Sequence, residues 1–479
     1  MTSLHAHLSQ AWGARPHRTF LSQPGGHQWS YEEVDSLAAS YGASLQARDV
    51  TPGDRVMVQV AKSPYAVALY LATLRIGAVF VPLNTAYTPT EVDAFVEDAE
   101  PAVVVTGAAN ARPGSLILEA DGSGTLKPGA GVEDVGRSGD DPAAMLYTSG
   151  TTGRSKGAVL TNDNLISNAK ALVEAWRFHE SDVLVHALPI FHVHGLFVAL
   201  HCAMFTASTV VFLDRFDVGE VKRSLGDATV MMGVPTFYSR LLAAPEPFSG
   251  VRLFTSGSAP LTAATHREFE HRTGHAILER YGMTEAGMIT SNPYEGARIP
   301  GTVGFALPGI EVRVTVDDAV APPGIAGNVE CRGPNVFSGY WRMPDHTAAA
   351  FTPDGWLRTG DIGKLDASGR LTLEGRASDM IISGGLNVYP VEVEQVLDAV
   401  PGVVEAAVVG LPHPDLGEAV TAFVTTDAAY DEQGARASLD AIARFKHPKQ
   451  IVEIDALPRN AMGKVLKAEL RSRYRSLFS

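Results

Sequence analysis

The chain has 479 residues, 45% hydrophobic and 19% charged, with a formal net charge of −14. This composition is typical of a globular protein, and the length predicts at least two domains. The negative charge argues against nucleic acid or an anionic membrane as the main partner. Only two cysteines occur, far apart, which excludes a disulfide framework and a cysteine-rich zinc site.

Two apolar stretches, 65–83 and 195–213, approach the length of a membrane span. Arg75 and Pro82 interrupt the first stretch, and His201 interrupts the second. We therefore expect each to form a buried helix followed by a buried strand, with no membrane association. Residues 1–15 contain no continuous apolar run, so we expect no signal peptide and a cytoplasmic protein.

Strand-length apolar runs alternate with helical patterns through most of the first 310 residues. The predicted strands are 56–60, 103–106, 143–147, 183–188, 209–213, 229–232 and 252–255, and the predicted helices include 31–47, 161–178, 195–205 and 262–273. Asp217 and Thr262 are the predicted N-caps of the helices that follow them. This alternation predicts a layered α/β architecture with largely parallel sheets, in which ligands bind at the carboxyl ends of strands.

From about residue 310 the pattern changes to short β segments with glycine and proline turns. A polar joint at 375–379 then precedes a compact tail. The pattern of this tail predicts helix 390–399, strand 403–410, strand 419–425, helix 435–445 and strand 450–454. We predict a large N-terminal multi-layer α/β domain with a β-rich subdomain over residues 1–376, and a small C-terminal α+β domain over 377–479.

A hydroxyl- and glycine-rich run at 148–157 follows the predicted strand 143–147. Its ten residues hold five hydroxyls, three glycines and two cations. Such a run can direct backbone N–H groups, hydroxyls and positive charge toward a polyphosphate. The spacing differs from the P-loop pattern, because Ser155 stands where that pattern needs its second glycine and Gly157 where it needs a hydroxyl. The composition alone is also typical of a solvated loop.

The run belongs to an ordered series of motifs along the chain. It is followed by 189–192, 256–260, 281–285, 355–361, 375–379, 383–385 and 458–464. In this order the motifs resemble those of the adenylate-forming superfamily of acyl-CoA synthetases, firefly luciferases and peptide-synthetase adenylation domains. The resemblance covers nearly the whole chain. It implies that ATP is used with Mg²⁺, that CoA is the co-substrate, and that the small domain is mobile.

The resemblance implies a nucleotide site. The residues that it assigns to this site are Thr148, Ser149, Gly150, Thr151, Thr152, Gly153, Lys156, Ser258, Ala259, Pro260, Tyr281, Gly282, Met283, Asp361 and Arg376. Tyr281 is expected to stack on adenine, while Asp361 and Arg376 are expected to bind the ribose. Glu285, with Thr152, is expected to hold Mg²⁺, because this hard cation prefers oxygen ligands. Ser155 stands where many relatives have proline, so the loop is expected to be more flexible.

The expected catalytic residues are Lys464, Thr284, Glu285 and His192. By resemblance, Lys464 bridges the substrate carboxylate and the α-phosphate as charge develops. Asp379 matches the hinge about which the small domain rotates between two half-reactions. The rotation is expected to withdraw Lys464 and to bring in the CoA-tunnel loop of Ser383, Gly384 and Gly385. His192 and His194 also suggest a zinc site, but no third ligand cluster accompanies them.

Three local runs, 192–197, 233–238 and 291–298, resemble malonyl-CoA synthetases. A dicarboxylate needs a second anion-binding group, and Arg298 is the expected one because guanidinium binds carboxylate bidentately. His194 and Met283 complete the expected acyl pocket, although an arginine in a glycine-containing loop is often a surface residue. We expect ATP-dependent ligation of malonate, or methylmalonate, to CoA through an acyl-AMP. The alternatives are a fatty- or aryl-acid CoA ligase, an enzyme that loads a carrier protein, and a nucleotide-binding regulator without catalysis.

Overall fold

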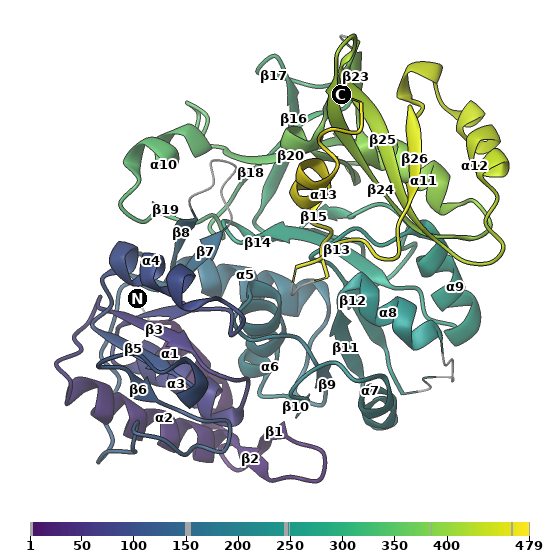
Figure 1. The fold of residues 1–479 in the computed structure, drawn as a ribbon. Helices are drawn as coiled ribbons and strands as arrows, with labels where there is room; N and C mark the ends of the chain where they lie inside the picture. Colours follow the sequence, from purple (N-terminus) through teal and green to yellow (C-terminus); the bar gives the residue numbers. More distant parts are fainter. Residues whose placement is uncertain are drawn as a thin grey trace.

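Two large sheets form the body of the N-terminal domain (Figure 1). The computed structural model describes residues 3–148, 155–243, 248, 250–384, 386–460 and 463–478. The first sheet has the order β15-β14-β13-β12-β11-β9-β10-β1-β2. Its strands are β1 (Thr19–Ser22), β2 (Gln28–Ser30), β9 (Val183–His186), β10 (Thr209–Phe212), β11 (Val230–Gly233), β12 (Leu253–Ser256), β13 (Leu278–Met283), β14 (Gly287–Ser291) and β15 (Phe305–Ala306). The run from β1 to β13 is parallel, and β2, β14 and β15 are antiparallel edge strands.

The second sheet has the order β19-β8-β7-β4-β3-β5-β6. Its strands are β3 (Arg55–Gln59), β4 (Val79–Pro82), β5 (Val103–Thr106), β6 (Leu116–Ile117), β7 (Pro142–Thr148), β8 (Lys156–Thr161) and β19 (Gly339–Tyr340). β7, β4, β3, β5 and β6 are parallel, whereas β8 returns antiparallel to β7. The predicted phosphate loop therefore joins the two arms of a hairpin at one end of this sheet.

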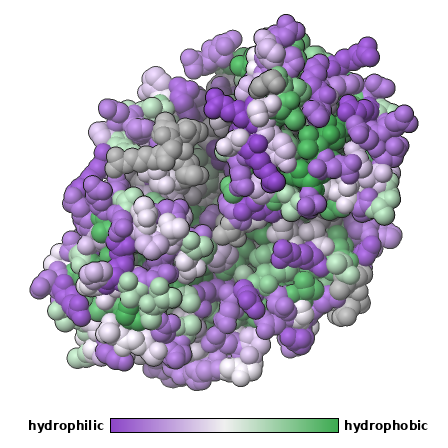
Figure 2. All heavy atoms as spheres, in the orientation of Figure 1, coloured by the Kyte–Doolittle hydropathy of each residue, from purple (hydrophilic) through white to green (hydrophobic). Residues whose placement is uncertain are grey.

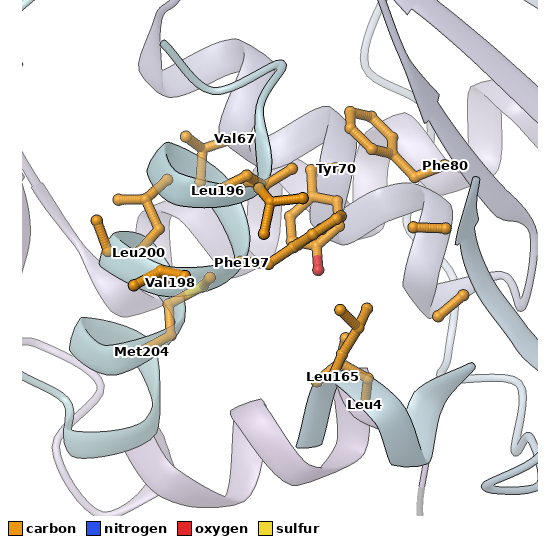
Figure 3. Close-up of a cluster of buried hydrophobic side chains, with 14 of the residues drawn as sticks. Leu4, Val67, Tyr70, Phe80, Leu165, Leu196, Phe197, Val198, Leu200 and Met204 are labelled. Carbon is orange, nitrogen blue, oxygen red and sulfur yellow. The ribbon is translucent and has the colours of Figure 1, made fainter. Parts of the chain in front are cut away.

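Helices and short helical turns cover the two sheets and fill the space between them. They are α1 (Leu4–Gly13), α2 (Tyr31–Gln46), α3 (Pro64–Arg75), α4 (Pro89–Ala99), η1 (Ala108–Asn110), α5 (Asn162–Ala175), η2 (His194–Leu200), α6 (His201–Thr206), α7 (Val218–Leu225), α8 (Pro235–Leu242) and α9 (Ala263–Thr273). Figure 3 shows Val67 and Tyr70 packed against Leu196 and Phe197, which joins α3 to η2 in the largest core cluster. The core thus holds η2, a rare π-helix, in a fixed place.

A five-stranded antiparallel sheet forms the β-rich subdomain, with the order β17-β16-β18-β20-β21. The elements here are β16 (Glu311–Val316), β17 (Ala319–Val320), β18 (Gly327–Arg332), α10 (Pro344–Ala350), β20 (Leu357–Leu365) and β21 (Leu371–Arg376). The tail follows with η3 (Ala377–Asp379), β22 (Ile381–Ser383), β23 (Leu386–Val388), α11 (Pro390–Asp398), β24 (Val403–His413), β25 (Gly417–Thr426), α12 (Glu432–Ser438), η4 (Leu439–Ala441), η5 (Arg444–Lys446), β26 (Gln450–Glu453) and α13 (Lys467–Arg473). The tail has a core of its own between α11, β24 and β25.

The predicted α/β architecture is confirmed, and so are both N-caps. The side chain of Asp217 accepts a hydrogen bond from the Glu220 N–H, and that of Thr262 from the Thr265 N–H. The stretches 65–83 and 195–213 each turn from a buried helix into a buried strand, as expected. None of the helices in the part of the chain that the structure describes is long and apolar enough to cross a membrane. Most of the face drawn in Figure 2 is hydrophilic.

Two helix predictions need correction. The predicted helix 195–205 is a π-helix that continues into an α-helix. The predicted helix 435–445 is wrong, because α12 ends at Ser438 and two short 3₁₀ turns follow. The Ser438 hydroxyl donates to the Gly434 carbonyl, and Ile442 adopts extended backbone angles that end the helical path.

A buried histidine joins three helices of the N-terminal domain. Nδ1 of His5 lies 2.8 Å from Asp134 Oδ2, and its Nε2 lies 3.4 Å from Asp35 Oδ1. Arg75 donates to the same Asp35 oxygen at 2.6 Å. Burial alone would lower the pKa of His5, but the contacts that its ring nitrogens make with the acceptor oxygens of Asp134 and Asp35 outweigh it and raise the pKa.

We predict that His5→Leu destabilises the protein by about 2 kcal/mol at pH 6, the value of hydrogen bonds to charged groups. A raised folded-state pKa stabilises the protein fully below the unfolded-state pKa of about 6.5, and this contribution is lost as the pH rises through the folded-state pKa. The difference in unfolding free energy between wild type and variant, measured by denaturant titration from pH 6 to pH 9, should therefore shrink. The matched variant of exposed His17, His17→Leu, should show little effect; a pH-independent loss for His5→Leu would contradict this account.

Candidate active site

The hairpin of β7 and β8 brings Thr148 and Lys156 opposite each other. The Lys156 ammonium lies 5.1 Å from the centre of the Tyr340 ring, on the neighbouring strand β19. The other predicted cradle residues, Ser149, Gly150, Thr151, Thr152 and Gly153, lie outside the described residues.

Glu285 lies beside this hairpin, in the turn between β13 and β14. Its carboxylate is buried and accepts hydrogen bonds from the Tyr340 hydroxyl at 2.9 Å and the Thr148 hydroxyl at 3.5 Å. Thr284, half-buried, precedes it in the same turn. Among the described residues no three His, Cys, Asp or Glu side chains gather as a metal site. A single carboxylate is the protein ligand expected when Mg²⁺ takes its other ligands from phosphate and water.

Asp361 and Arg376 face each other on the adjacent strands β20 and β21. Arg376 Nε lies 2.9 Å from Asp361 Oδ1, and Arg376 Nη1 donates to the Thr359 carbonyl at 3.0 Å. The Tyr281 hydroxyl donates to Asp361 as well. Burial raises the pKa of Asp361, and the positive charge of Arg376 opposes that rise. The predicted ribose pair and the predicted adenine-stacking tyrosine are therefore in contact.

The loop after β12 and the end of β13 form the next part of the site. Ser258 has a φ of +70°, in the left-handed region, and its hydroxyl lies 3.2 Å from His194 Nδ1. Ala259 and Pro260 continue this loop. Gly282 sits where a Cβ atom would lie 2.1 Å from the Gly287 carbonyl oxygen, so only glycine permits this tight β13–β14 hairpin. Met283, the last residue of β13, is half-buried.

Lys464 approaches the ribose pair from the C-terminal domain. The surrounding protein lowers the pKa of Lys464 by desolvation and Arg376 lowers it further, whereas Asp361 and Asp379 act in the opposite direction. The Lys464 N–H donates to Asn460 Oδ1 at 3.0 Å. A Cβ on Gly463 would lie 3.1 Å from the hydroxyl of Thr236 in α8, so this turn is seated against the N-terminal domain.

The predicted CoA-tunnel loop lies elsewhere. Gly384, with a φ of +58°, turns the chain from β22 into β23, and its N–H donates to the Leu416 carbonyl at 2.9 Å. Ser383 is paired with Gly417, and Gly385 lies outside the described residues. In Figure 1, β23 is remote from β13 and β7. Asp379, the predicted hinge, accepts a hydrogen bond from Arg471 at 2.7 Å. In this domain arrangement the turn that carries Lys464 lies near the nucleotide residues, and the Ser383–Gly384 turn lies away from them.

The structure gives Arg298 three backbone carbonyl partners, which favour a structural role over the predicted acyl-pocket role. Its guanidinium donates to the backbone carbonyls of Ala276, Tyr294 and Pro293, at 2.7, 2.9 and 3.3 Å. Ala276 precedes β13, whereas the nucleotide residues follow at its carboxyl end. At roughly 3.3 Å per residue, Ala276 and Tyr281 are about 16 Å apart along the strand. Arg298 therefore holds a loop in place at the end of β13 that lies opposite the nucleotide residues.

Arg280, which the sequence-based assignment missed, occupies the position expected of a pocket arginine. It is 4% exposed, and among the described residues its Nε and Nη2 atoms have no hydrogen-bond partner. Burial lowers the pKa of Arg280 to about 10, which leaves it charged at neutral pH. A Cβ on Gly257 would lie 2.3 Å from Arg280 Nη1, so the glycine makes room for the guanidinium.

Both predicted histidines lie next to Arg280. Burial, followed by the charge of Arg280, lowers the pKa of His192 to about 4 and that of His194 well below its usual range. His194 Nε2 and Ser256 Oγ are buried and have no hydrogen-bond partner within the described part of the chain. A neutral histidine pair beside an unpaired guanidinium is a site for an anion. The signal in the sequence was a charged residue inside a buried strand, directly before the 281–285 motif.

Comparison with known proteins agrees with this geometry. The model of the AMP-binding enzyme family matches residues 8–341, and that of the AMP-binding enzyme C-terminal domain matches residues 392–464. The chain belongs to the AMP-binding enzyme family. It is 35% identical to the malonate–CoA ligase of Arabidopsis thaliana, over 93% of this chain and 84% of the relative.

Two solved structures of MatB from Rhodopseudomonas palustris cover 100% of both chains. The ATP-bound structure is 47% identical in sequence with a TM-score of 0.96, and the apo structure is 48% identical with a TM-score of 0.84. The arrangement of the domains here is therefore closer to the ATP-bound one, in keeping with Lys464 next to Asp361 and Arg376.

We predict that Asp361→Asn weakens AMP binding about tenfold, because it removes the charge from an acceptor of ribose hydroxyls. The dissociation constant is measured by isothermal titration calorimetry. Asp366→Asn, in an exposed turn at the end of β20, is the matched control and should bind AMP like the wild type. Equal affinity for Asp361→Asn and wild type would place the ribose elsewhere.

Proposed function

We propose that this chain is an AMP-forming malonate–CoA ligase. In the first half-reaction a malonate carboxylate oxygen attacks the α-phosphorus of ATP, which forms malonyl-AMP and releases pyrophosphate. In the second, the CoA thiol loses its proton and attacks the acyl carbon, which forms the thioester and releases AMP. Mg²⁺, carried on ATP, neutralises phosphate charge in the first step.

The observation that carries the choice of acid is the buried guanidinium of Arg280, whose Nε and Nη2 atoms have no hydrogen-bond partner among the described residues. A buried charge without a partner is costly, and an alkyl or aryl chain would leave it so. A second carboxylate would accept both N–H groups and pair with the charge. The alternative of a fatty- or aryl-acid CoA ligase is disfavoured for this reason.

The nucleotide residues have separate tasks in this proposal. Asp361 and Arg376 hold the ribose, and Tyr281 stacks on adenine while its hydroxyl braces Asp361. Glu285 takes Mg²⁺ with help from Thr152, and the 148–156 loop with Thr284 binds phosphate. Lys464 bridges the attacking carboxylate and the α-phosphate, where negative charge develops.

The second half-reaction needs a different domain arrangement. We propose a division into residues 1–376 and 377–479 that rotate about Asp379, which takes Lys464 out and brings the Ser383–Gly384 turn in. His192 then lies between the acyl group and the incoming thiol. The proposal also places the enzyme in the reducing cytoplasm, because Cys202 and Cys331 are free thiols, with only small molecules as partners.

We predict that Arg280→Met lowers kcat/KM for malonate by about 10²- to 10³-fold, the effect of removing one partner of a buried ion pair. Relative preference should shift toward butyrate, which never made this contact. The control is Arg298→Ala, which removes a less buried arginine that contacts the chain just before β13 and should leave the malonate-to-butyrate ratio unchanged. If the malonate-to-butyrate ratio changes in the Arg298 variant and not in the Arg280 variant, Arg298 binds the second carboxylate and the role proposed for Arg280 is contradicted.

We predict that Lys464→Ala reduces adenylation about 10²- to 10³-fold, as expected for loss of a preorganised donor to developing charge. Thioester formation from supplied malonyl-AMP should be largely spared, because Lys464 serves only one domain arrangement. Single-turnover assays of the two half-reactions measure both, and Lys467→Ala serves as the neighbouring control. An equal loss in both half-reactions would contradict the two arrangements.

A further inference from the structure

Lys62 connects the two large sheets at the carboxyl ends of their strands. It follows β3 of the second sheet, and its acceptors end β9 and follow β10 of the first sheet. The ammonium contacts His186 Nδ1 at 2.8 Å, the His186 carbonyl at 2.9 Å and the Leu213 carbonyl. Burial lowers the pKa of Lys62 well below its usual range, yet three acceptors surround its nitrogen, and only the ammonium form has a donor for each of them. The same group lies 4.4 Å from the centre of the Phe212 ring.

The contact with Lys62 fixes the tautomer of His186. Because Nδ1 accepts from the ammonium, the ring proton stands on Nε2, which donates to the Gly195 carbonyl at 2.9 Å. His186 is fully buried, and burial lowers its pKa well below the usual range, so the ring is neutral. The chain of contacts therefore runs from Lys62 through one imidazole tautomer to the backbone of η2.

Gly195 follows His194 in η2 and is tightly seated. A Cβ at this position would lie 2.0 Å from the Pro189 carbonyl oxygen, so the backbone here has little freedom. His194 is then aimed at Ser258, 3.2 Å away, with its Nε2 buried and unpaired among the described residues. π-helical segments are rare and are frequently found at functional sites.

We propose that Lys62 and His186 are positioning residues that set the place of His194 in the acyl pocket and thereby the selectivity for a second carboxylate. This inference rests on the proposed function. Neither residue touches the substrate: the Lys62 donors are used within the protein, and His186 acts through the Gly195 carbonyl. The contacts at the junction of the two sheets thus set the selectivity of the acyl pocket.

The test compares Lys62→Met, Lys62→Arg and the exposed control Lys170→Met. For each we measure kcat and KM for malonate and butyrate, KM for ATP, and the melting temperature. Lys62→Met should raise KM for malonate about tenfold, as expected when a charged hydrogen-bond network is broken. The KM for ATP and kcat/KM for butyrate should stay within about twofold. Lys62→Arg, which keeps the charge, should recover part of the malonate affinity.

Equal losses for malonate and butyrate would show a merely structural lysine and overturn the inference. If Lys62→Met does not fold, His186→Gln and His186→Leu decide instead. The Gln amide can still donate toward the Gly195 carbonyl, so His186→Gln should keep more malonate selectivity than His186→Leu; equal selectivity overturns the inference. A wild type without malonate turnover would contradict the proposed function itself, whereas equal losses in an active wild type contradict only the positioning role.

Discussion

The acyl end of the site depends on one buried charge. Arg280 stands in a buried strand, and two nitrogens of its guanidinium have no hydrogen-bond partner in the part of the chain that the structure describes. Its neighbours accommodate that charge. Gly257 leaves room for the guanidinium, and the pKa values of His192 and His194 are lowered so that both rings are neutral. A buried charge of this kind persists in a folded protein when its partner comes from outside. In the proposed function, a ligand with a carboxylate at its far end supplies that partner.

At the nucleotide end, by contrast, both carboxylates already have hydrogen-bond partners within the protein. Asp361 is bound by Arg376 and Tyr281, and Glu285 by Tyr340 and Thr148. These groups hold their geometry before substrate arrives. The turn that carries Lys464 is seated against α8, a contact that a domain movement can break. In a chain of net charge −14, the cations needed for ATP and a dianionic acid are concentrated at this one place.

Much of this could be predicted from the sequence, because the motifs are local. The alternation of strands and helices placed the site at the carboxyl ends of strands, and the ordered motifs placed the ribose pair and the lysine turn. The acyl pocket could not be assigned in the same way. Choosing Arg280 over Arg298 needs the contact between Gly257 and β13, which joins two strands through the folded sheet. The helix predicted at 435–445 failed for a local reason, since the Ser438 hydroxyl donates to the Gly434 carbonyl and Ile442 adopts extended backbone angles.

The central claim is that the pocket recognises the second carboxylate before any chemistry occurs. The most direct measurement is the affinity of the wild type for two non-hydrolysable sulfamoyl adenylates, one carrying a malonyl and the other a butyryl group, by isothermal titration calorimetry. The account predicts that the malonyl analogue binds at least about 100-fold more tightly, because only it pairs with the buried guanidinium. Equal affinity for the two analogues would contradict it.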